Sequence, residues 1–286
     1  MCSNMGAGAR RAASPTAPAA QAAAPAAAPA AAQQAASGLV SDTGVQNMDD
    51  ATLTALITRA MNAAITPDGR DDTVAQRIAD ALGITQSVPE SVPQEALAQY
   101  RSQSGDNGLL YRTVNDTDDG SKTARQIAHE LTTRNGSYGL NYGGGRVWGT
   151  GLYFVGSGAA NDPGEAAHHS ANGYGYGSAY TVEARLRPGA RIATDADLAG
   201  PAARAWARSH VGALAKAGIL VDASGRTYSA GRMRDKDVDT TVAMLMGYDG
   251  YKATKQYNVY HTIFNLGALQ IARGNKYDRA LNRALT

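Results

Sequence analysis

The stretch "WGTGLYFVGS", residues 148–157, combines a strand-like apolar run with three glycines. Residues 152–155 are Leu, Tyr, Phe and Val, which are typical of a β-strand. Glycine inside a strand marks a bulge or a place where a ligand or another backbone comes close. We therefore predict a strand here whose backbone is closely approached by another group.

Segments on both sides of this stretch predict further strands. "GLLYRTV" (108–114) is a short apolar strand that carries one arginine, and residues 178–187 alternate between apolar and polar side chains. "YNVYHTIF" (257–264) and "GALQIA" (267–272) close the chain with β-rich patterns. Helical patterns lie between these strands without a regular βαβ alternation, which favours an α+β fold over a doubly wound sheet.

The chain divides into three parts by composition. Residues 1–43 form an Ala/Pro-rich arm that we expect to be disordered, because its prolines remove helix hydrogen bonds and it has no periodic apolar face. Residues 44–105 carry three helical patterns, which predict a small helical subdomain. The main domain then spans residues 106–286.

Helix boundaries follow from capping residues. Asp49 or Asp50 is expected to cap the first helix of the helical subdomain, and Ser121 to cap a helix with inward Ala124, Ile127, Ala128 and Leu131. Residues 201–217 predict one helix, and Asp237 is expected to cap the next, which ends at Gly247.

Composition excludes several classes of function. The formal net charge of +2 does not favour a nucleic-acid partner. No uninterrupted apolar run reaches the length of a membrane span, so we expect a soluble protein. Cys2 is the single cysteine, which rules out an intrachain disulfide and a multi-cysteine zinc site. His168 and His169 have no third ligand at a defined spacing, so we expect no metal.

The glycines do not fit the standard phosphate-binding motifs. Those at 143, 144, 145, 149 and 151 lead into a strand, whereas a dinucleotide-binding G-x-G-x-x-G opens a helix. The P-loop pattern and the G-x-S-x-G elbow of hydrolases are both absent. A flexible surface loop is the simplest alternative for this region.

The order of the motifs resembles the ADP-ribosyltransferase family. "LYRTV" (110–114) resembles the first-strand motif of the arginine-type branch, which includes phage and bacterial toxin-like mono-ADP-ribosyltransferases. "GTGLYF" (149–154) resembles the G-x-G-I-Y-F strand of the poly-ADP-ribose polymerase branch, and "SANGYG" (170–175) resembles the helix start that follows it. The resemblance implies a split β-sheet core with flanking helices, and a transferase that uses NAD as substrate.

The resemblance also implies a binding site for NAD. A planar guanidinium such as that of Arg112 can hold a pyrophosphate through two hydrogen bonds. The face of Tyr153 can receive the flat, cationic nicotinamide ring, with Tyr174 or Tyr176 as a second plate. Small and polar neighbours complete the expected binding set, which is Arg112, Thr113, Gly149, Thr150, Gly151, Tyr153, Ser170, Tyr174 and Tyr176.

The family's late-strand glutamate has no counterpart at the matching position. Tyr260 occupies that position and His261 follows it, so these two are the candidate catalytic residues. In a strand they point to opposite faces. Gln256 and Asp249 are further candidates for the missing polar group. A slow transferase, a transferase with a displaced acid and an NAD-binding relic all remain open.

Two functions from different classes follow. The first is a mono-ADP-ribosyltransferase that modifies a protein acceptor. The alternative is a catalytically degenerate NAD-binding or structural module of a virion or effector assembly, tethered by the N-terminal arm. Either protein would be virion-associated or delivered to a host cytoplasm, as the likeness to phage-type transferases implies.

Overall fold

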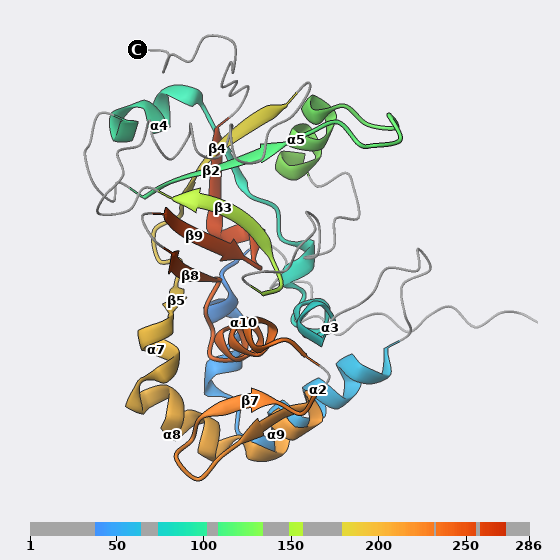
Figure 1. Ribbon diagram of the computed structural model, residues 1–286, viewed down its shortest axis with the longest axis vertical. Coiled ribbons are helices and arrows are strands. Elements are labelled where there is room, and N and C mark those ends of the chain that lie inside the picture. Colours follow the sequence, from blue (N-terminus) through green and yellow to red (C-terminus); the bar gives the residue numbers. More distant parts are fainter. Residues whose placement is uncertain are drawn as a thin grey trace, which may run out of the picture.

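The computed structural model describes residues 38–63, 74–101, 108–133, 149–156, 179–231, 233–255 and 258–272. These residues form an α+β fold, as expected, with a large mixed sheet (Figure 1). The helices are α2 (Asp50–Asn62), α3 (Val74–Ala81), α4 (Gln94–Arg101), α5 (Ala124–Thr133), α7 (Asp195–Ala199), α8 (Pro201–Ser209), α9 (Val211–Lys216) and α10 (Asp235–Leu245). Within the described ranges, no helix is both long and apolar enough to cross a membrane.

Eight strands form one sheet, in the order β1-β10-β4-β2-β3-β9-β8-β5. They are β1 (Glu90–Val92), β2 (Leu109–Val114), β3 (Leu152–Gly156), β4 (Tyr180–Leu186), β5 (Ile192–Thr194), β8 (Gly250–Lys255), β9 (Asn258–Ile263) and β10 (Leu269–Ala272). The two edge pairs, β1 with β10 and β5 with β8, are parallel, and all inner pairs are antiparallel. A separate hairpin contains β6 (Ile219–Val221) and β7 (Thr227–Ser229).

The pairing between β2 and β3 is short. In the part of β3 that the structure describes, Leu110 pairs with Gly156 and Tyr111 with Val155, whereas β2 and β4 pair along six positions. Within the described residues, the sheet is therefore continuous, with two paired positions between β2 and β3. The split core of the ADP-ribosyltransferases remains a prediction.

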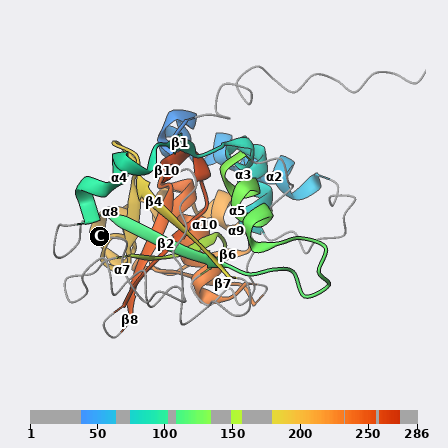
Figure 2. The same ribbon diagram turned by 90° about the horizontal axis from the view of Figure 1, so that it is seen from above.

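The two faces of the sheet have different coverings. One face carries an apolar cluster between β2, β3, β4 and the buried side of α5, which contains Leu110, Val114, Phe154 and Val182. Near β10, the opposite face packs against α4 through Leu97. Near β8, it packs against the helices that lie below the sheet in Figure 1. Seen from above, α4 and α5 lie on opposite sides of β4 (Figure 2).

The N-terminal helices share one core with the C-terminal half of the chain. Leu53 and Ile57 of α2 and Ile78 of α3 belong to the same buried cluster as Leu214 of α9 and Leu245 of α10. Figure 1 shows α2, α9 and the β6–β7 hairpin together at the end of the molecule away from β2. Helices α2 and α3 therefore share a core with the C-terminal half of the chain.

The packed chain begins earlier than the predicted arm would end. The Val40 side chain is fully buried, and its N–H donates to Oδ1 of Asp249 at 2.7 Å. Asp249 is also fully buried and accepts from the Arg191 N–H at 2.9 Å and from Asn265 Nδ2 at 2.7 Å. A buried carboxylate needs such donors, so residues 38–43 are held by the body of the fold. Residues 1–37 lie outside the described residues.

Local capping agrees with one of the expectations and differs from two. Asp49 caps α2 as predicted, and its side chain accepts from the Thr52 N–H. Helix α5 is capped by Thr123 instead of Ser121, because Thr123 and Gln126 exchange side-chain and backbone hydrogen bonds. Helix α10 begins after Arg234, so Asp237 lies in its first turn and does not cap it.

The helix predicted over 201–217 is divided into α8 and α9 at His210. The backbone of His210 leaves the helical region, at φ −125° and ψ 32°. Its ring lies 2.8 Å from the Trp206 carbonyl oxygen through Nδ1 and 2.9 Å from the Met48 carbonyl oxygen through Nε2. The contact with Met48 links this break to the segment before α2.

Candidate functional site

The predicted site residues that the structure describes come from three neighbouring strands and the turn before β3. Arg112 and Thr113 lie on β2, Tyr153 on β3, and Tyr260 and His261 on β9. These strands are neighbours in the sheet, in the order β2-β3-β9. Three motifs separated along the chain therefore meet at the middle of one sheet.

The pleat sends these residues to opposite faces. Tyr260 lies opposite Val155 and packs with Tyr111 on the face covered by α4. His261 lies opposite Phe154, which belongs to the cluster beneath α5. The expected opposite orientation of Tyr260 and His261 follows from this register. A ligand on either face can contact only one of the two.

The face that carries Tyr260 is unusually polar for the interior of a sheet. A row across four strands contains Glu183, Tyr111, Val155 and Tyr260, each in register with the next. The neighbouring row contains the pair Thr113 and Thr181 on β2 and β4, and the pair Tyr153 and Thr262 on β3 and β9. Hydroxyl groups and one carboxylate thus line the centre of this face.

Glu183 is the residue of this face that sequence reasoning missed. Its side chain is 2% exposed, and the Tyr111 hydroxyl donates to its Oε1 at 3.4 Å. Beside them, the hydroxyls of Thr113 and Thr181 are 2.8 Å apart. A signal was present in the alternation of β4, where Glu183 falls between the apolar Val182 and Ala184 and so points to the opposite face.

Arg112 bridges β2 and β3. Its side chain is 9% exposed, and Nη1 donates to the Tyr153 carbonyl oxygen at 2.8 Å. Arg112 lies one residue beyond the last paired position on β2, and Tyr153 lies two residues beyond it on β3. The guanidinium therefore ties β2 to the backbone of the predicted nicotinamide-binding tyrosine. Arg112 lies opposite Val182, so its side chain leaves β2 on the α5 face, away from the ring of Tyr153.

The groups that approach the glycines of the opening stretch are parts of the protein. A Cβ on Gly149, whose φ is +92°, would lie 2.4 Å from the Lys236 carbonyl oxygen and 2.5 Å from Thr240 of α10. A Cβ on Gly151 would lie 2.7 Å from Thr262 of β9. We predicted that the missing side chains of these glycines leave room for a ligand. In the structure, α10 and β9 occupy that room.

The third glycine of the stretch makes room for His261. A Cβ on Gly156 would lie 2.7 Å from the imidazole Cε1 and 2.8 Å from Nδ1. The histidine ring is 5% exposed and sits over this strand on the α5 side of the sheet. Its position is compatible with ordinary packing in the sheet, which was the simplest expectation for this residue.

The predicted binding residues Thr150 and Tyr153 both have partners within the protein. The Thr150 side chain is fully buried, and its hydroxyl donates to Oδ1 of Asp237 at 2.7 Å. The Tyr153 hydroxyl donates to the Gly149 carbonyl oxygen at 2.5 Å. The ring of Tyr153 is only half-buried. Its face, rather than its hydroxyl, is therefore the part suited to a ligand.

A charged network lies beside this turn, where α10 meets β5 and β8. Lys236 Nζ donates to Asp195, to Asp239 and to the Tyr251 hydroxyl, and Tyr251 also donates to Asp195. Burial lowers the pKa of Lys236, but its hydrogen bonds to Tyr251, Asp195 and Asp239 outweigh this and hold the pKa well above its ordinary value. The lysine is thus a fixed cation within a satisfied network.

Other candidates lie away from this site or outside the described residues. Asp249 anchors residues 38–43 and belongs to the structural core, and Ser170, Tyr174, Tyr176 and Gln256 are not described. Among the residues described, no group of three potential ligands could hold a metal ion.

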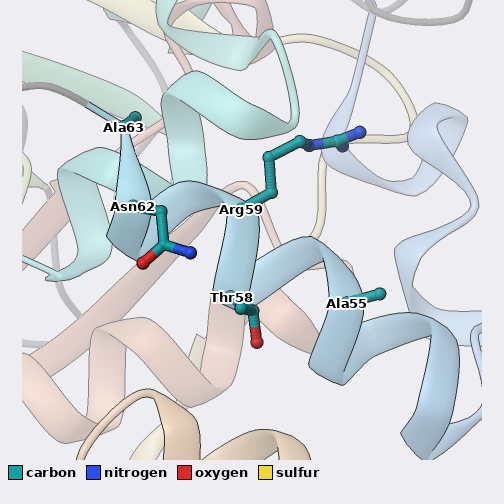
Figure 3. Close-up of a pocket in the computed structure, with 5 residues that line it drawn as sticks. All are labelled: Ala55, Thr58, Arg59, Asn62 and Ala63. Atoms are coloured by element: carbon teal, nitrogen blue, oxygen red, sulfur yellow. The ribbon is translucent and has the colours of Figure 1, made fainter.

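A hollow of about 670 Å³ lies on α2 and contains none of the predicted site residues. It is lined by Ala55, Thr58, Arg59, Asn62 and Ala63. Figure 3 shows Arg59 directed away from Thr58 and Asn62, so the polar groups do not converge on one point. We therefore place the candidate site on the sheet.

Comparison with protein-family models finds no match, and neither do the comparisons with curated proteins and with solved structures.

Proposed function

We propose that this protein is an NAD-dependent mono-ADP-ribosyltransferase that modifies a protein acceptor. In the reaction, the bond between nicotinamide and ribose C1 breaks and nicotinamide leaves with the electron pair. A bond then forms between C1 and a nucleophilic atom of the acceptor, which loses a proton to solvent. We assign this reaction because the motifs LYRTV, GTGLYF and SANGYG follow one another in the order found in ADP-ribosyltransferases.

The observation that carries the proposal is the polar face across β4, β2, β3 and β9. Strands in a sheet are about 4.8 Å apart, so Tyr153 and Glu183, two strands and two residues apart, are separated by roughly 12 Å between their Cα atoms. Because nicotinamide is bonded directly to ribose C1, Glu183 at this distance does not contact the reacting ribose of a bound dinucleotide. The ribose hydroxyls of the dinucleotide suit the hydroxyl-lined rows, and its nicotinamide suits the half-buried ring of Tyr153.

Glu183 supplies this face with a carboxylate. The transition state of nicotinamide loss develops positive charge on the ribose, and at roughly 12 Å from Tyr153 the Glu183 carboxylate favours it only as a distant charge. Tyr260 lies on the same face and can act as a hydrogen-bond partner for the ribose. His261 lies on the other face and cannot contact a ligand bound beside Tyr153. Of the two candidate catalytic residues, the proposal therefore assigns the role to Tyr260.

The alternative function is NAD binding without cleavage. It is favoured by the composition of β9, since Asn258–Ile263 contains no carboxylate at the position where the family's acid is expected. In that case Glu183 would serve the packing of the sheet, and Tyr153 would still bind nicotinamide.

One experiment separates these functions. The purified protein is incubated with NAD labelled in the adenylate portion, in the presence of a cell lysate, and released nicotinamide and protein-bound label are measured together. Tyr153→Ala is the test variant, and Tyr228→Ala is its control, because Tyr228 is an exposed tyrosine on the β6–β7 hairpin.

We expect wild type and Tyr228→Ala to release nicotinamide and to label protein, and Tyr153→Ala to do neither at a comparable rate. NAD binding without nicotinamide release would support the binding module. Absence of NAD binding by calorimetry would contradict both functions.

A further inference from the structure

The turn before β3 is attached to the first half of α10 by buried hydrogen bonds. The Thr150 hydroxyl donates to Oδ1 of Asp237 at 2.7 Å, and the Thr150 N–H donates to the Thr240 hydroxyl at 3.3 Å. Thr150 and Thr240 are fully buried, and Asp237 is 6% exposed. Water therefore cannot readily replace these contacts.

The backbone of the turn is pressed against the same helix. The space beside Gly149 is filled by the Lys236 carbonyl oxygen and the Thr240 side chain, so a side chain at position 149 would displace one of the two elements. Gly149 is thus held from two sides, by its own contact with α10 and through its neighbour Thr150.

The position of Gly149 is transmitted to the ring of Tyr153. The Tyr153 hydroxyl donates to the Gly149 carbonyl oxygen at 2.5 Å, which fixes the far end of the side chain. The near end is fixed by strand β3, whose Tyr153 carbonyl oxygen accepts from Arg112. The ring is therefore supported at both ends, and one of these supports originates in α10.

We propose that Asp237 is a positioning residue that acts through Thr150 and Gly149 to orient the ring of Tyr153 for nicotinamide. The inference rests on the proposed function, in which Tyr153 binds the substrate. Thr150, which we expected to bind NAD, instead supports the residues that do so, because its hydroxyl donates to Asp237 on α10. A stacking contact depends on the tilt and height of the ring, so a support of this kind sets affinity for the ligand.

The test combines variants at Thr150 with a change at Tyr153. Thr150→Val removes the bond to Asp237 while keeping the shape of the side chain, and Thr150→Ser keeps the hydroxyl. Thr241→Val is the matched control: Thr241 is also fully buried on α10, and its hydroxyl donates within the helix, to the Asp237 carbonyl oxygen at 2.7 Å.

We expect Thr150→Val to weaken NAD binding by about tenfold in calorimetry, and Thr150→Ser and Thr241→Val to weaken it much less. In the Tyr153→Phe background, which already lacks the bond to Gly149, Thr150→Val should weaken binding by less than about twofold further. Equal losses in both backgrounds, or an equal loss in Thr241→Val, would overturn the inference, because the effect would then come from general packing.

A second measurement does not depend on NAD. Tyrosines are replaced by 3-fluorotyrosine, and the ¹⁹F resonance of Tyr153 is assigned by its loss in Tyr153→Phe. We expect Thr150→Val to shift or broaden this resonance and Thr241→Val to leave it in place. If NAD does not bind to the wild type, the proposed function fails, while the resonance still decides whether α10 positions Tyr153. An unchanged resonance in folded Thr150→Val refutes the positioning role.

Discussion

Replacing Asp249 by alanine should strongly destabilise the fold, because its carboxylate is the meeting point of three distant segments. It accepts from the Val40 N–H before α2, from the Arg191 N–H before β5, and from Asn265 Nδ2 after β9. The side chain of Asp249 is fully buried. Alanine would leave these donors without their acceptor.

The magnitude follows from the number of donors that water cannot reach. The bonds from Val40 and Asn265 are buried, whereas the one from Arg191 is partly exposed. A buried donor left without a partner costs about 1–3 kcal/mol, so we expect a loss of about 2–6 kcal/mol in the free energy of unfolding. Single domains are stable by about 5–15 kcal/mol, so the loss is a large fraction of the total.

The assay is urea unfolding followed by circular dichroism, with Asp222→Ala as the matched control. Asp222 also accepts three hydrogen bonds, from the Ser224 N–H, the Ser224 hydroxyl and the Arg226 N–H, but these lie at the exposed turn of the β6–β7 hairpin. Water can replace them, so the control should lose little. If both variants unfold at the same urea midpoint with unchanged slopes, burial is not what makes Asp249 important, and the reasoning is refuted.

The pH dependence supplies an independent check on Asp249. Burial raises its pKa and outweighs the hydrogen bonds from Arg191, Val40 and Asn265 that lower it. Between its unfolded pKa of about 3.9 and the raised folded value, the folded protein binds the proton more tightly, so the contribution of this group to stability falls as pH rises. The difference in unfolding free energy between wild type and Asp249→Asn should therefore decrease with rising pH in this window. A pH-independent difference would contradict the raised pKa.

Three further predictions concern the arm, the charged network and the proposed acid. Removing residues 1–37 should leave the melting temperature nearly unchanged, whereas removing residues 1–43 should lower it, because Val40 is buried; equal melting temperatures in scanning calorimetry would contradict this. The raised pKa of Lys236 gives stability that is complete below about pH 10.4 and is lost as pH rises through the folded pKa, so the unfolding free energy of Lys236→Met should vary less than that of wild type in this alkaline range. A unit charge roughly 12 Å away at an effective dielectric constant of ~20 contributes about 1.4 kcal/mol, so Glu183→Gln should slow nicotinamide release by about tenfold with little change in NAD affinity, while Glu130→Gln on α5 should not; unchanged release would show that Glu183 does not act on the reaction.

Local patterns were enough to predict the strands β2, β3, β4, β9 and β10 and most helix faces. Each of these depends on the alternation or the 3.6-residue period of neighbouring side chains, which is a property of a short segment. The α+β class followed from the order of the elements. The opposite orientation of Tyr260 and His261 followed in the same way, because the pleat of a strand depends on nothing beyond the strand itself.

Tertiary structure alone decided which distant groups meet. Thr150 and Asp237 are 87 residues apart, Tyr111 and Glu183 are 72 apart, and Val40 and Asp249 are 209 apart. The break at His210 has the same origin, since its ring bonds the Met48 carbonyl oxygen 162 residues away. The sequence indicated that something approaches the glycines before β3, but strand order and helix packing determined that α10 and β9 do so, because such contacts depend on long-range register that no local period encodes.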